Sequence, residues 1–272
     1  MSKKNILFYG NCQLGKIKDI MCLSPVLYDV FYISCFSTTL SDIEFDTILK
    51  KADIVITQPI HDNYRDMYYL ASNYVVNKCK EGATIIFVNN CHFDFYYFDL
   101  HYNKSAQPNK MSNYYHDSMI NCISNHFDVN YYREKYLENN DLKTTEELQC
   151  ICDKSINELQ SRYENMFQYI KYNTHFINVV DFIRNNYKNK LLFYTFNHPT
   201  KYLLQFIALE IIKIVGIQDT IDYHMDPFSD EKYILYSCIQ KMVNFNIKEY
   251  TPFISNTSNI GDIFQTTLRE GI

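Results

Sequence analysis

The sequence has no tryptophan, only six glycines and six prolines, and no long apolar run. Residues 206–217 come closest to such a run, but Glu210 and Lys213 interrupt them, well short of the roughly 18 apolar residues that span a membrane. No block of Lys and Arg occurs, and the formal net charge is -5, which argues against nucleic acid as the main partner. The apolar run at residues 6–9 is too short for a secretory signal, so we expect a cytoplasmic protein without a transmembrane segment.

The nine cysteines lack the paired short spacings of a zinc site. Cys150 and Cys152 are separated by a single residue, which is too close for that purpose. In a cytoplasmic protein most of these cysteines are expected to be free thiols that behave as small hydrophobic residues. The sequence therefore predicts no metal site.

Apolar runs and helical patterns alternate over the first third of the chain. Strands are expected at 6–9, 30–34 with Tyr28 near the start, 53–57 and 84–88, and helices at 14–21, 41–51 and 64–80. The helix at 41–51 opens with the capping-box pattern of Ser41 and Glu44. Continuous apolar strands joined by helices are typical of a parallel sheet covered on both faces, so the sequence predicts a three-layer α/β fold of the flavodoxin type.

The remaining two thirds of the chain look more helical. We expect a single domain over 1–272, with a helical insertion at about 92–190 that contains a long amphipathic helix beginning at a second capping box, Thr144–Glu147. A strand is expected at 191–195, a helix from Pro199 to about 215 that ends at Gly216, and a last helix at 231–243. The tail from about residue 255 is expected to be loosely ordered.

Polar side chains with hydrogen-bonding or nucleophilic ability follow each of four expected strands. These corners are Gly10–Gln13, Thr57–Ile60 with His61, Asn89–His92 and Asn197–Thr200. Ligands of open parallel sheets bind outside the carboxyl ends of the strands. We therefore expect one site that contains Cys12, Gln58, His92 and His198.

Each residue has a functional interpretation and a plainer alternative. Cys12 at a helix start has its thiolate stabilised by the dipole and free amides, although a packed turn thiol is the commoner case. The amides from Gln13 to Gly15, with Asn11 or Gln58, are candidates to hold an oxyanion or a phosphate. His198 is a candidate general base, because the pKa of histidine is naturally near neutrality. The alternative is that an isolated histidine lies on the surface or packs in the core.

Weaker candidates lie beside these corners. Lys16 and Arg65 lie where a phosphate would bind, although solvated surface charges are the alternative for both. His61 and His92 are candidates for substrate contact, and Tyr115, His116 or Asp117 are candidates to reach the site from the insertion. For Asp117 the alternative is a helix cap.

Three of these segments together resemble the WcbI-type polysaccharide biosynthesis proteins. They are Gly10-Asn-Cys-Gln13, Gln58-Pro59 and Phe196-Asn-His-Pro-Thr200, and the resemblance spans residues 4–216. It implies an acetyltransferase for capsular or related surface polysaccharide, with coenzyme A and acetyl-CoA as ligands and a location near the assembly machinery at the inner membrane. It also implies a distant likeness to the SGNH hydrolases, in which Cys12 replaces the serine, but no Asp-x-x-His pair follows near the C-terminus.

The resemblance suggests roles for the corner residues. Acetyl transfer to the hydroxyl of a sugar or polysaccharide precursor is expected to use Cys12, His198, Gln58 and Asn11. Coenzyme A is expected around Gly10, Gln13, Leu14, Lys16, Arg65, Asn197 and Thr200, and the sugar near His61, His92, Tyr115 and His116. Aromatic residues of 93–97 are candidates to stack on the adenine, and plain packing in the core is the alternative for them.

The residues leave the mechanism and the enzyme class open. Transfer is either direct or passes through an acetyl-Cys12 intermediate. The alternatives to a transferase are a glycan esterase that uses water as acceptor and a non-catalytic module that binds a nucleotide or glycan.

Overall fold

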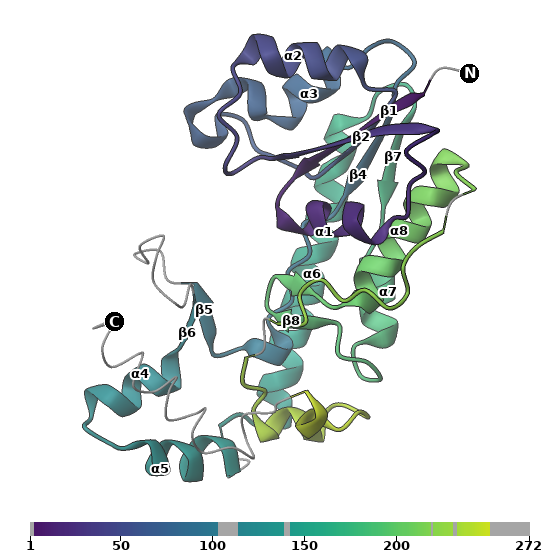
Figure 1. Cartoon of the computed structure of the whole chain (residues 1–272). Helices are drawn as coiled ribbons and strands as arrows, with labels where there is room; N and C mark the ends of the chain where they lie inside the picture. Colours follow the sequence, from purple (N-terminus) through teal and green to yellow (C-terminus); the bar gives the residue numbers. More distant parts are fainter. Residues whose placement is uncertain (1–2, 103–113, 139–141, 219, 231–232, 251–272) are drawn as a thin grey trace. The chain divides into compact units, whose positions relative to one another are not determined.

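The computed structural model of the chain describes residues 3–102, 114–138, 142–218, 220–230 and 233–250, so the tail from 255 lies outside the described residues (Figure 1). The chain divides into two compact units. The first unit comprises residues 1–91, 156–185 and 199–229, and the second comprises 92–155, 186–198 and 230–272. The second unit begins where the insertion was expected, whereas residues 156–185 belong to the first.

The first unit is built on a sheet of five parallel strands in the order β2-β1-β3-β4-β7. The strands are β1 (Lys4–Gly10), β2 (Tyr28–Ser34), β3 (Ile54–Thr57), β4 (Thr84–Val88) and β7 (Thr174–Ile177). Phe8 of β1 pairs with Tyr32 of β2 and with Ile56 of β3, and Ile56 pairs with Ile86 of β4. The expected α/β fold and four of these strands are confirmed.

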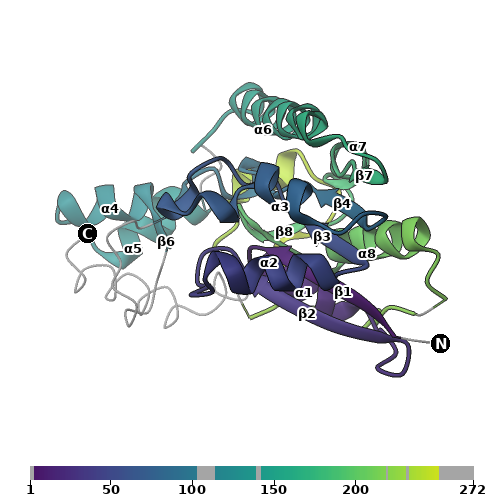
Figure 2. The ribbon, with the colours of Figure 1, turned by 90° about the horizontal axis from the view of Figure 1, so that it is seen from above.

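Helices cover both faces of this sheet. Helices α2 (Asp42–Lys51) and α3 (Ser72–Lys78) pack on one face, where Phe45 and Val75 bury the side chains of Leu7, Tyr9 and Val55. Helices α1 (Cys12–Ile20) and α8 (Lys201–Val215) cover the opposite face (Figures 1 and 2). The apolar strands are therefore buried on both sides, as their composition predicts.

Both predicted capping boxes are present. Ser41 Oγ accepts the backbone N–H of Glu44, whose carboxylate accepts the N–H of Ser41 at 2.8 Å. Thr144 and Glu147 make the same reciprocal pair, with distances of 3.2 and 2.8 Å. The second box precedes α6 (Thr145–Asn165), the long helix that the amphipathic pattern predicts. Each pair satisfies N–H groups that have no partner within the helix.

Two strand predictions need correction. Strand β7 lies within the expected helical insertion, yet it pairs with β4 at the edge of the main sheet. Three of its four residues are only partly buried, so it lacks the continuous apolar run that marks the inner strands. The strand expected at 191–195 exists as β8 (Phe193–Thr195), but it pairs with β9 (His198–Pro199) outside the main sheet.

Three helix predictions also need correction. The helix expected at 64–80 is reduced to two 3-10 turns, Tyr64–Asp66 and Tyr68–Leu70, followed by α3, because left-handed backbone at Asn63, Arg65 and Asp66 interrupts it. Helix α8 begins at Lys201 rather than at Pro199, although it ends at Gly216 with φ of 68° as expected. Within the described part of 231–243, a 3-10 turn at Ser237–Lys241 replaces the last helix.

The second unit has an aromatic core. Its fully buried side chains include Phe93, Phe95, Tyr96 and Phe193. The ring of Phe93 lies edge-on to Tyr96 and tilted to Phe193, and the ring of Phe95 is tilted to Tyr96. The same unit contains β5 (Leu100–Tyr102), β6 (Tyr114–His116), α4 (Asp117–Ser124), α5 (Val129–Tyr132) and the π-helix Arg133–Glu138. Helix α7 (Val180–Asn186) belongs to the first unit except for its last residue. No helix among the described residues is long and apolar enough to cross a membrane.

Replacing Tyr9 by Phe tests the core beneath α2 and α3. The Tyr9 hydroxyl is buried and donates a hydrogen bond of 2.7 Å to the Leu70 carbonyl oxygen. The substitution removes the donor and keeps the ring, so we expect the free energy of unfolding in urea to fall by about 1–3 kcal/mol. Tyr172→Phe is the control, because Tyr172 is 88% exposed. Equal stability of the two variants would contradict the role of this hydrogen bond.

Candidate active site

Cys12 is the first residue of α1, directly after the carboxyl end of β1. Asn11 is the N-cap of this helix, and its side-chain oxygen accepts the backbone N–H of Gln13 at 2.9 Å. The Cys12 side chain is partly buried and belongs to the first turn, where the helix dipole favours negative charge. The sequence motif thus folds as expected, into a strand, a capped corner and a helix that presents a thiol.

A chain of side-chain amides holds this corner. Gln58, at the end of β3, accepts the backbone N–H of Asn11 at 2.9 Å and donates to Gln13 Oε1 at 3.2 Å. Gln13 in turn donates to the Cys91 carbonyl oxygen at 2.8 Å and accepts the Cys91 N–H at 3.0 Å. Asn11 Nδ2 donates to Asn90 Oδ1 at 2.8 Å. These bonds, here called the amide network, join the ends of β1, β3 and β4.

Two glycines allow this close packing. A Cβ atom at Gly10 would lie 2.6 Å from Gln58 Oε1 and 2.8 Å from Leu14 Cδ1, both closer than real contacts. A Cβ at Gly15 would lie 3.0 Å from the ring of Tyr32. The Tyr32 hydroxyl donates to the Asn11 carbonyl oxygen at 3.0 Å, so both glycines bring a polar group against the corner.

Two other cysteines, Cys91 and Cys35, lie close to this corner. Cys91 is fully buried, and burial raises the pKa of its thiol to about 12. Cys35 is buried as well, and burial raises the pKa of its thiol despite a hydrogen bond from Tyr64. Because the thiolate is the nucleophile, these two cysteines are poorly suited to react near neutral pH.

The two cations expected to bind phosphate make contacts within the first unit. The ammonium of Lys16 lies 5.8 Å from the centre of the Phe228 ring. The guanidinium of Arg65 donates to the carbonyl oxygens of Cys35 and Thr38 at 3.2 and 3.1 Å. Arg65 therefore ties two loops together, and a role in phosphate binding remains a prediction for both cations.

His61 and Thr200 also belong to the first unit. The exposed His61 ring hydrogen-bonds the Asp62 carbonyl oxygen at 2.8 Å and lies edge-on to Tyr64 at 5.4 Å. Thr200 is the N-cap position of α8. Neither residue is part of the amide network.

His198 and Asn197 belong to the second unit. His198 is only 8% exposed, its backbone N–H donates to Thr195 Oγ1 at 3.1 Å, and its ring lies edge-on to Tyr114 at 6.0 Å. Asn197 Oδ1 accepts the Tyr114 hydroxyl at 2.9 Å. The structure brings Cys12, Asn11, Gln13 and Gln58 together, whereas the grouping of His92 and His198 with them remains a prediction.

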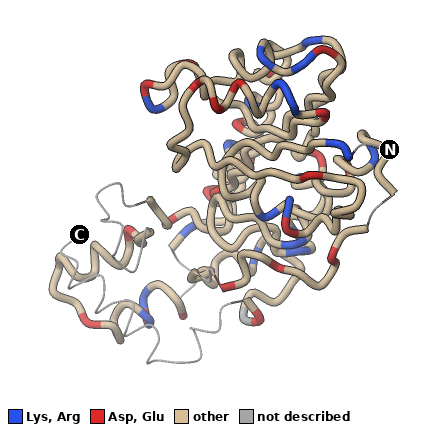
Figure 3. Tube along the Cα trace, turned by 45° about the horizontal axis from the view of Figure 1, so that its top comes forward, with Lys and Arg blue, Asp and Glu red and all other residues tan. Residues whose placement is uncertain are grey.

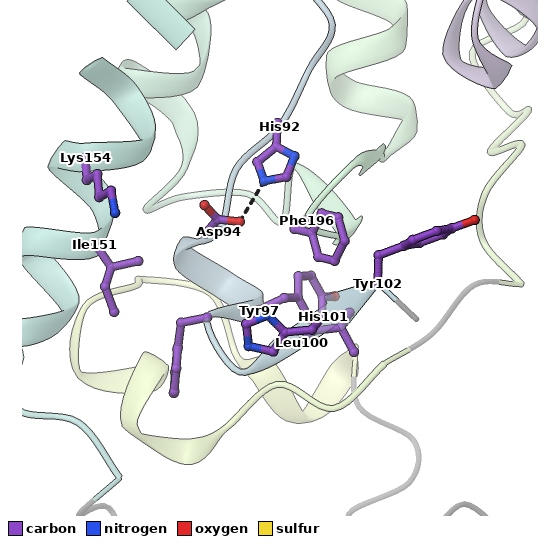
Figure 4. A pocket seen from close by; sticks show the side chains of 10 residues that line it. His92, Asp94, Tyr97, Leu100, His101, Tyr102, Ile151, Lys154 and Phe196 are labelled. Carbon is purple, nitrogen blue, oxygen red and sulfur yellow. Dashed lines mark hydrogen bonds and ion pairs between the residues drawn. The ribbon is translucent and has the colours of Figure 1, made fainter. Parts of the chain in front are cut away.

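Part of the second unit forms an open pocket of about 380 Å³ (Figure 4). Its polar centre is His92, whose Nε2 lies 2.8 Å from Asp94 Oδ1. The remaining lining residues are Tyr97, Phe98, Leu100, His101, Tyr102, Ile151, Lys154 and Phe196. Sequence reasoning selected His92 but missed Asp94, although the His-x-Asp spacing at a strand corner was visible.

The last two predicted substrate residues lie on β6. His116 is buried, with Nδ1 3.2 Å from the Tyr236 hydroxyl and 3.5 Å from Asp99 Oδ2. Burial raises the pKa of Asp99, but His116, Ser118 and Tyr236 outweigh this effect and hold that pKa below its usual value. A ligand would have to open this cluster to reach His116. Tyr115 is partly buried, with its ring 5.8 Å from His101.

Three of the aromatic residues expected to stack on adenine, Phe93, Phe95 and Tyr96, are fully buried in the core. This placement fits the alternative of plain packing.

Acidic and basic residues are interspersed along the described trace (Figure 3). In that part of the chain, no group of three or more His, Cys, Asp or Glu side chains is placed to hold a metal ion.

Comparison with known proteins identifies the family. Residues 5–220 match the family model described as polysaccharide biosynthesis enzyme WcbI. The chain belongs to the WcbI family. It is therefore an enzyme of polysaccharide biosynthesis, and the resemblance found in the corner motifs is confirmed. No curated protein matches the chain significantly.

A solved WcbI structure has a similar fold. It is described as a novel polysaccharide biosynthesis enzyme, in the native form without a disulfide bond between coenzyme A and a cysteine of that protein. The two chains are 19% identical, the TM-score is 0.75, and the match covers 98% of this chain and 95% of the other. This likeness shows that the two proteins share a fold.

Replacing Gly10 by Ala tests the amide network. The new Cβ would clash with Gln58 Oε1 and force it away from the Asn11 N–H, so we expect the free energy of unfolding to fall by about 1–3 kcal/mol. Gln58→Ala removes the clashing atom together with its hydrogen bonds. A double-mutant cycle in urea should therefore show that Gly10→Ala is milder in the Gln58→Ala background. Strict additivity would mean that Gln58 does not require a glycine at position 10.

Proposed function

We propose that this WcbI-family enzyme transfers an acetyl group from acetyl-CoA to a hydroxyl of a sugar or polysaccharide precursor. The observation that carries the proposal is the partly buried Cys12 thiol at the N-terminus of α1, fixed by the amide network. The related structure described in terms of coenzyme A and a cysteine supports an encounter of this thiol with coenzyme A. Family membership supports a carbohydrate acceptor.

The thiol suits a two-step reaction. The Cys12 thiolate attacks the carbonyl carbon of acetyl-CoA, the carbon–sulfur bond to coenzyme A breaks, and coenzyme A leaves with the electron pair and takes up a proton. One thioester replaces another, so the exchange is nearly balanced in energy. The sugar hydroxyl then attacks acetyl-Cys12, loses its proton to a base, and leaves as an ester while the Cys12 thiolate is restored. In the direct alternative, the hydroxyl attacks acetyl-CoA itself.

The amide network narrows the choice of oxyanion donor. Two of the expected donors are already engaged within the corner. The Gln13 N–H donates to the side-chain oxygen of Asn11, and the Leu14 N–H donates to the carbonyl oxygen of Asn11. Asn11 Nδ2 carries two hydrogens, and Asn90 takes one of them. The second hydrogen of Asn11 Nδ2, beside Cys12, is our candidate donor to the oxyanion that forms on the acetyl group.

Two histidines are candidates for the base. His198, favoured by its motif, is buried and packs against Tyr114. His92 is more exposed and is oriented by Asp94. A histidine held by a carboxylate is a common arrangement for a general base, because the carboxylate stabilises the imidazolium that forms.

Titration with coenzyme A and acetyl-CoA, followed by peptide mass spectrometry, tests the proposal. We expect micromolar binding of both ligands in isothermal titration calorimetry. After incubation with acetyl-CoA and an acid quench, the two-step reaction predicts one acetyl group on the Cys12 peptide and none on the peptides of Cys91 or exposed Cys22. The Cys12→Ala variant should bind coenzyme A and lack this acetyl group.

The controls separate the alternatives. Cys22→Ala should retain the acetylated Cys12 peptide. Turnover by Cys12→Ala with no acetyl-Cys12 in the wild type would support direct transfer. No binding of either ligand by the folded protein would contradict the transferase and favour the esterase or the binding module.

Replacing Asn11 by Ser tests the proposed oxyanion donor. Serine is as good an N-cap as asparagine, so the helix start should persist, but its short side chain lacks the amide donor. We expect acetylation of Cys12 to slow by about a hundredfold with little change in thermal stability. The measurement is single-turnover acetylation followed by mass spectrometry. An unchanged rate would remove Asn11 from the oxyanion site.

A further inference from the structure

The second-unit pocket combines aromatic faces with a few polar groups. Phe196 and Tyr97 form buried walls, whereas Tyr102 is 52% exposed. The ring of Tyr102 is held edge-on by Tyr114 at 5.6 Å. The ring of Phe196 lies 5.0 Å from that of His92, and Figure 4 draws both. A concave site with apolar walls and a small number of oriented polar groups is the usual form of a small-molecule site.

The polar groups of the pocket are held in place before any ligand binds. Asp94 Oδ1 lies 2.8 Å from His92 Nε2, and Asp94 Oδ2 accepts the Ser155 hydroxyl at 3.4 Å. The Asp94 N–H donates to the same Ser155 oxygen at 3.1 Å. The Asp94 carboxylate is therefore oriented by His92 on one oxygen and by Ser155 on the other.

The charges of the pocket balance. The lining includes one carboxylate, on Asp94, and one ammonium, on Lys154. His101 lies 2.9 Å from the carboxylate of Asp117. A phosphate would meet the Asp94 carboxylate without a second lysine or an arginine in the lining. The pocket therefore favours an uncharged ligand with many hydroxyl groups over a nucleotide.

We propose that this pocket binds the uncharged sugar ring of the acceptor, with an apolar face of the ring against Tyr102 and Phe196 and its hydroxyls on Asp94 and His92. A sugar ring presents C–H groups on its faces and hydroxyls at its edge, which matches the distribution of aromatic and polar groups in the lining. The inference rests on the proposed function for the identification of this sugar as the acetyl acceptor. Sugar binding itself does not require that function.

Saturation-transfer difference NMR on the full-length protein tests this binding. The probes are the methyl glycosides of glucose, galactose, mannose and N-acetylglucosamine. We expect at least one probe to bind the wild type. The Tyr102→Ala and Asp94→Asn variants should each weaken that binding about tenfold or more. Tyr172→Ala is the matched control, because Tyr172 is an exposed aromatic residue outside the pocket lining, and it should bind as the wild type does.

The outcomes separate this proposal from the transferase proposal. Sugar binding that depends on Tyr102 and Asp94, without any binding of coenzyme A, would support the pocket and overturn the transferase. Coenzyme A binding and acetyl-Cys12, with no sugar bound or with sugar binding unchanged in both variants, would overturn the pocket alone. Displacement of the bound glycoside by coenzyme A, together with loss of coenzyme A affinity in both variants, would assign the pocket to the cofactor and also overturn the proposal.

Discussion

The contact of the Gln58 amide with the backbone of Gly10 and Asn11 is the constraint on which the candidate site depends. It requires a residue without a side chain at position 10, because a Cβ there would lie 2.6 Å from Gln58 Oε1. From this contact the hydrogen bonds pass to Gln13 and then to the backbone of Cys91. Hydrogen bonds in a low-dielectric interior reinforce one another, and an unpaired member is costly. The amide network thereby holds the ends of β1, β3 and β4 together.

This network explains how a thiol can be presented without being buried. The side chains that fix the corner are amides, which hydrogen-bond one another without introducing charge next to Cys12. The thiol itself lies in the first turn of α1, beside the capped start of the helix. Cys91 shows the opposite design, since burial raises the pKa of its thiol to about 12 while its backbone serves the network. The Cys12 side chain is left partly exposed, whereas Cys91 is buried and contributes backbone groups to the amide network.

The sequence predicts the inner strands and the Cys12 corner because their signals are local. Strands β1, β3 and β4 are apolar runs buried on both faces, and the capping boxes need only four residues each. Strand β7 escapes detection because it is a half-exposed edge strand. Strand β8 is predicted, but its pairing with β9 outside the main sheet is not, because pairing partners are decided by the tertiary fold. The left-handed backbone at Arg65, which shortens the expected helix, has no signal in the residue type. In the sequence, the His92–Asp94 pair is marked only by the His-x-Asp spacing, which does not show that the two side chains contact each other.

The pocket chemistry bears on how an enzyme of this family could choose among sugars. Aromatic walls bind the faces of many sugar rings with similar strength, so they contribute affinity more than selectivity. Discrimination comes from polar groups, because a misplaced hydroxyl leaves a preset donor or acceptor unpaired. Ser155 and His92 fix the direction of the Asp94 carboxylate, and Asp94 in turn fixes the His92 ring. Since each member is oriented by another, the pair can recognise the position of a hydroxyl rather than its mere presence.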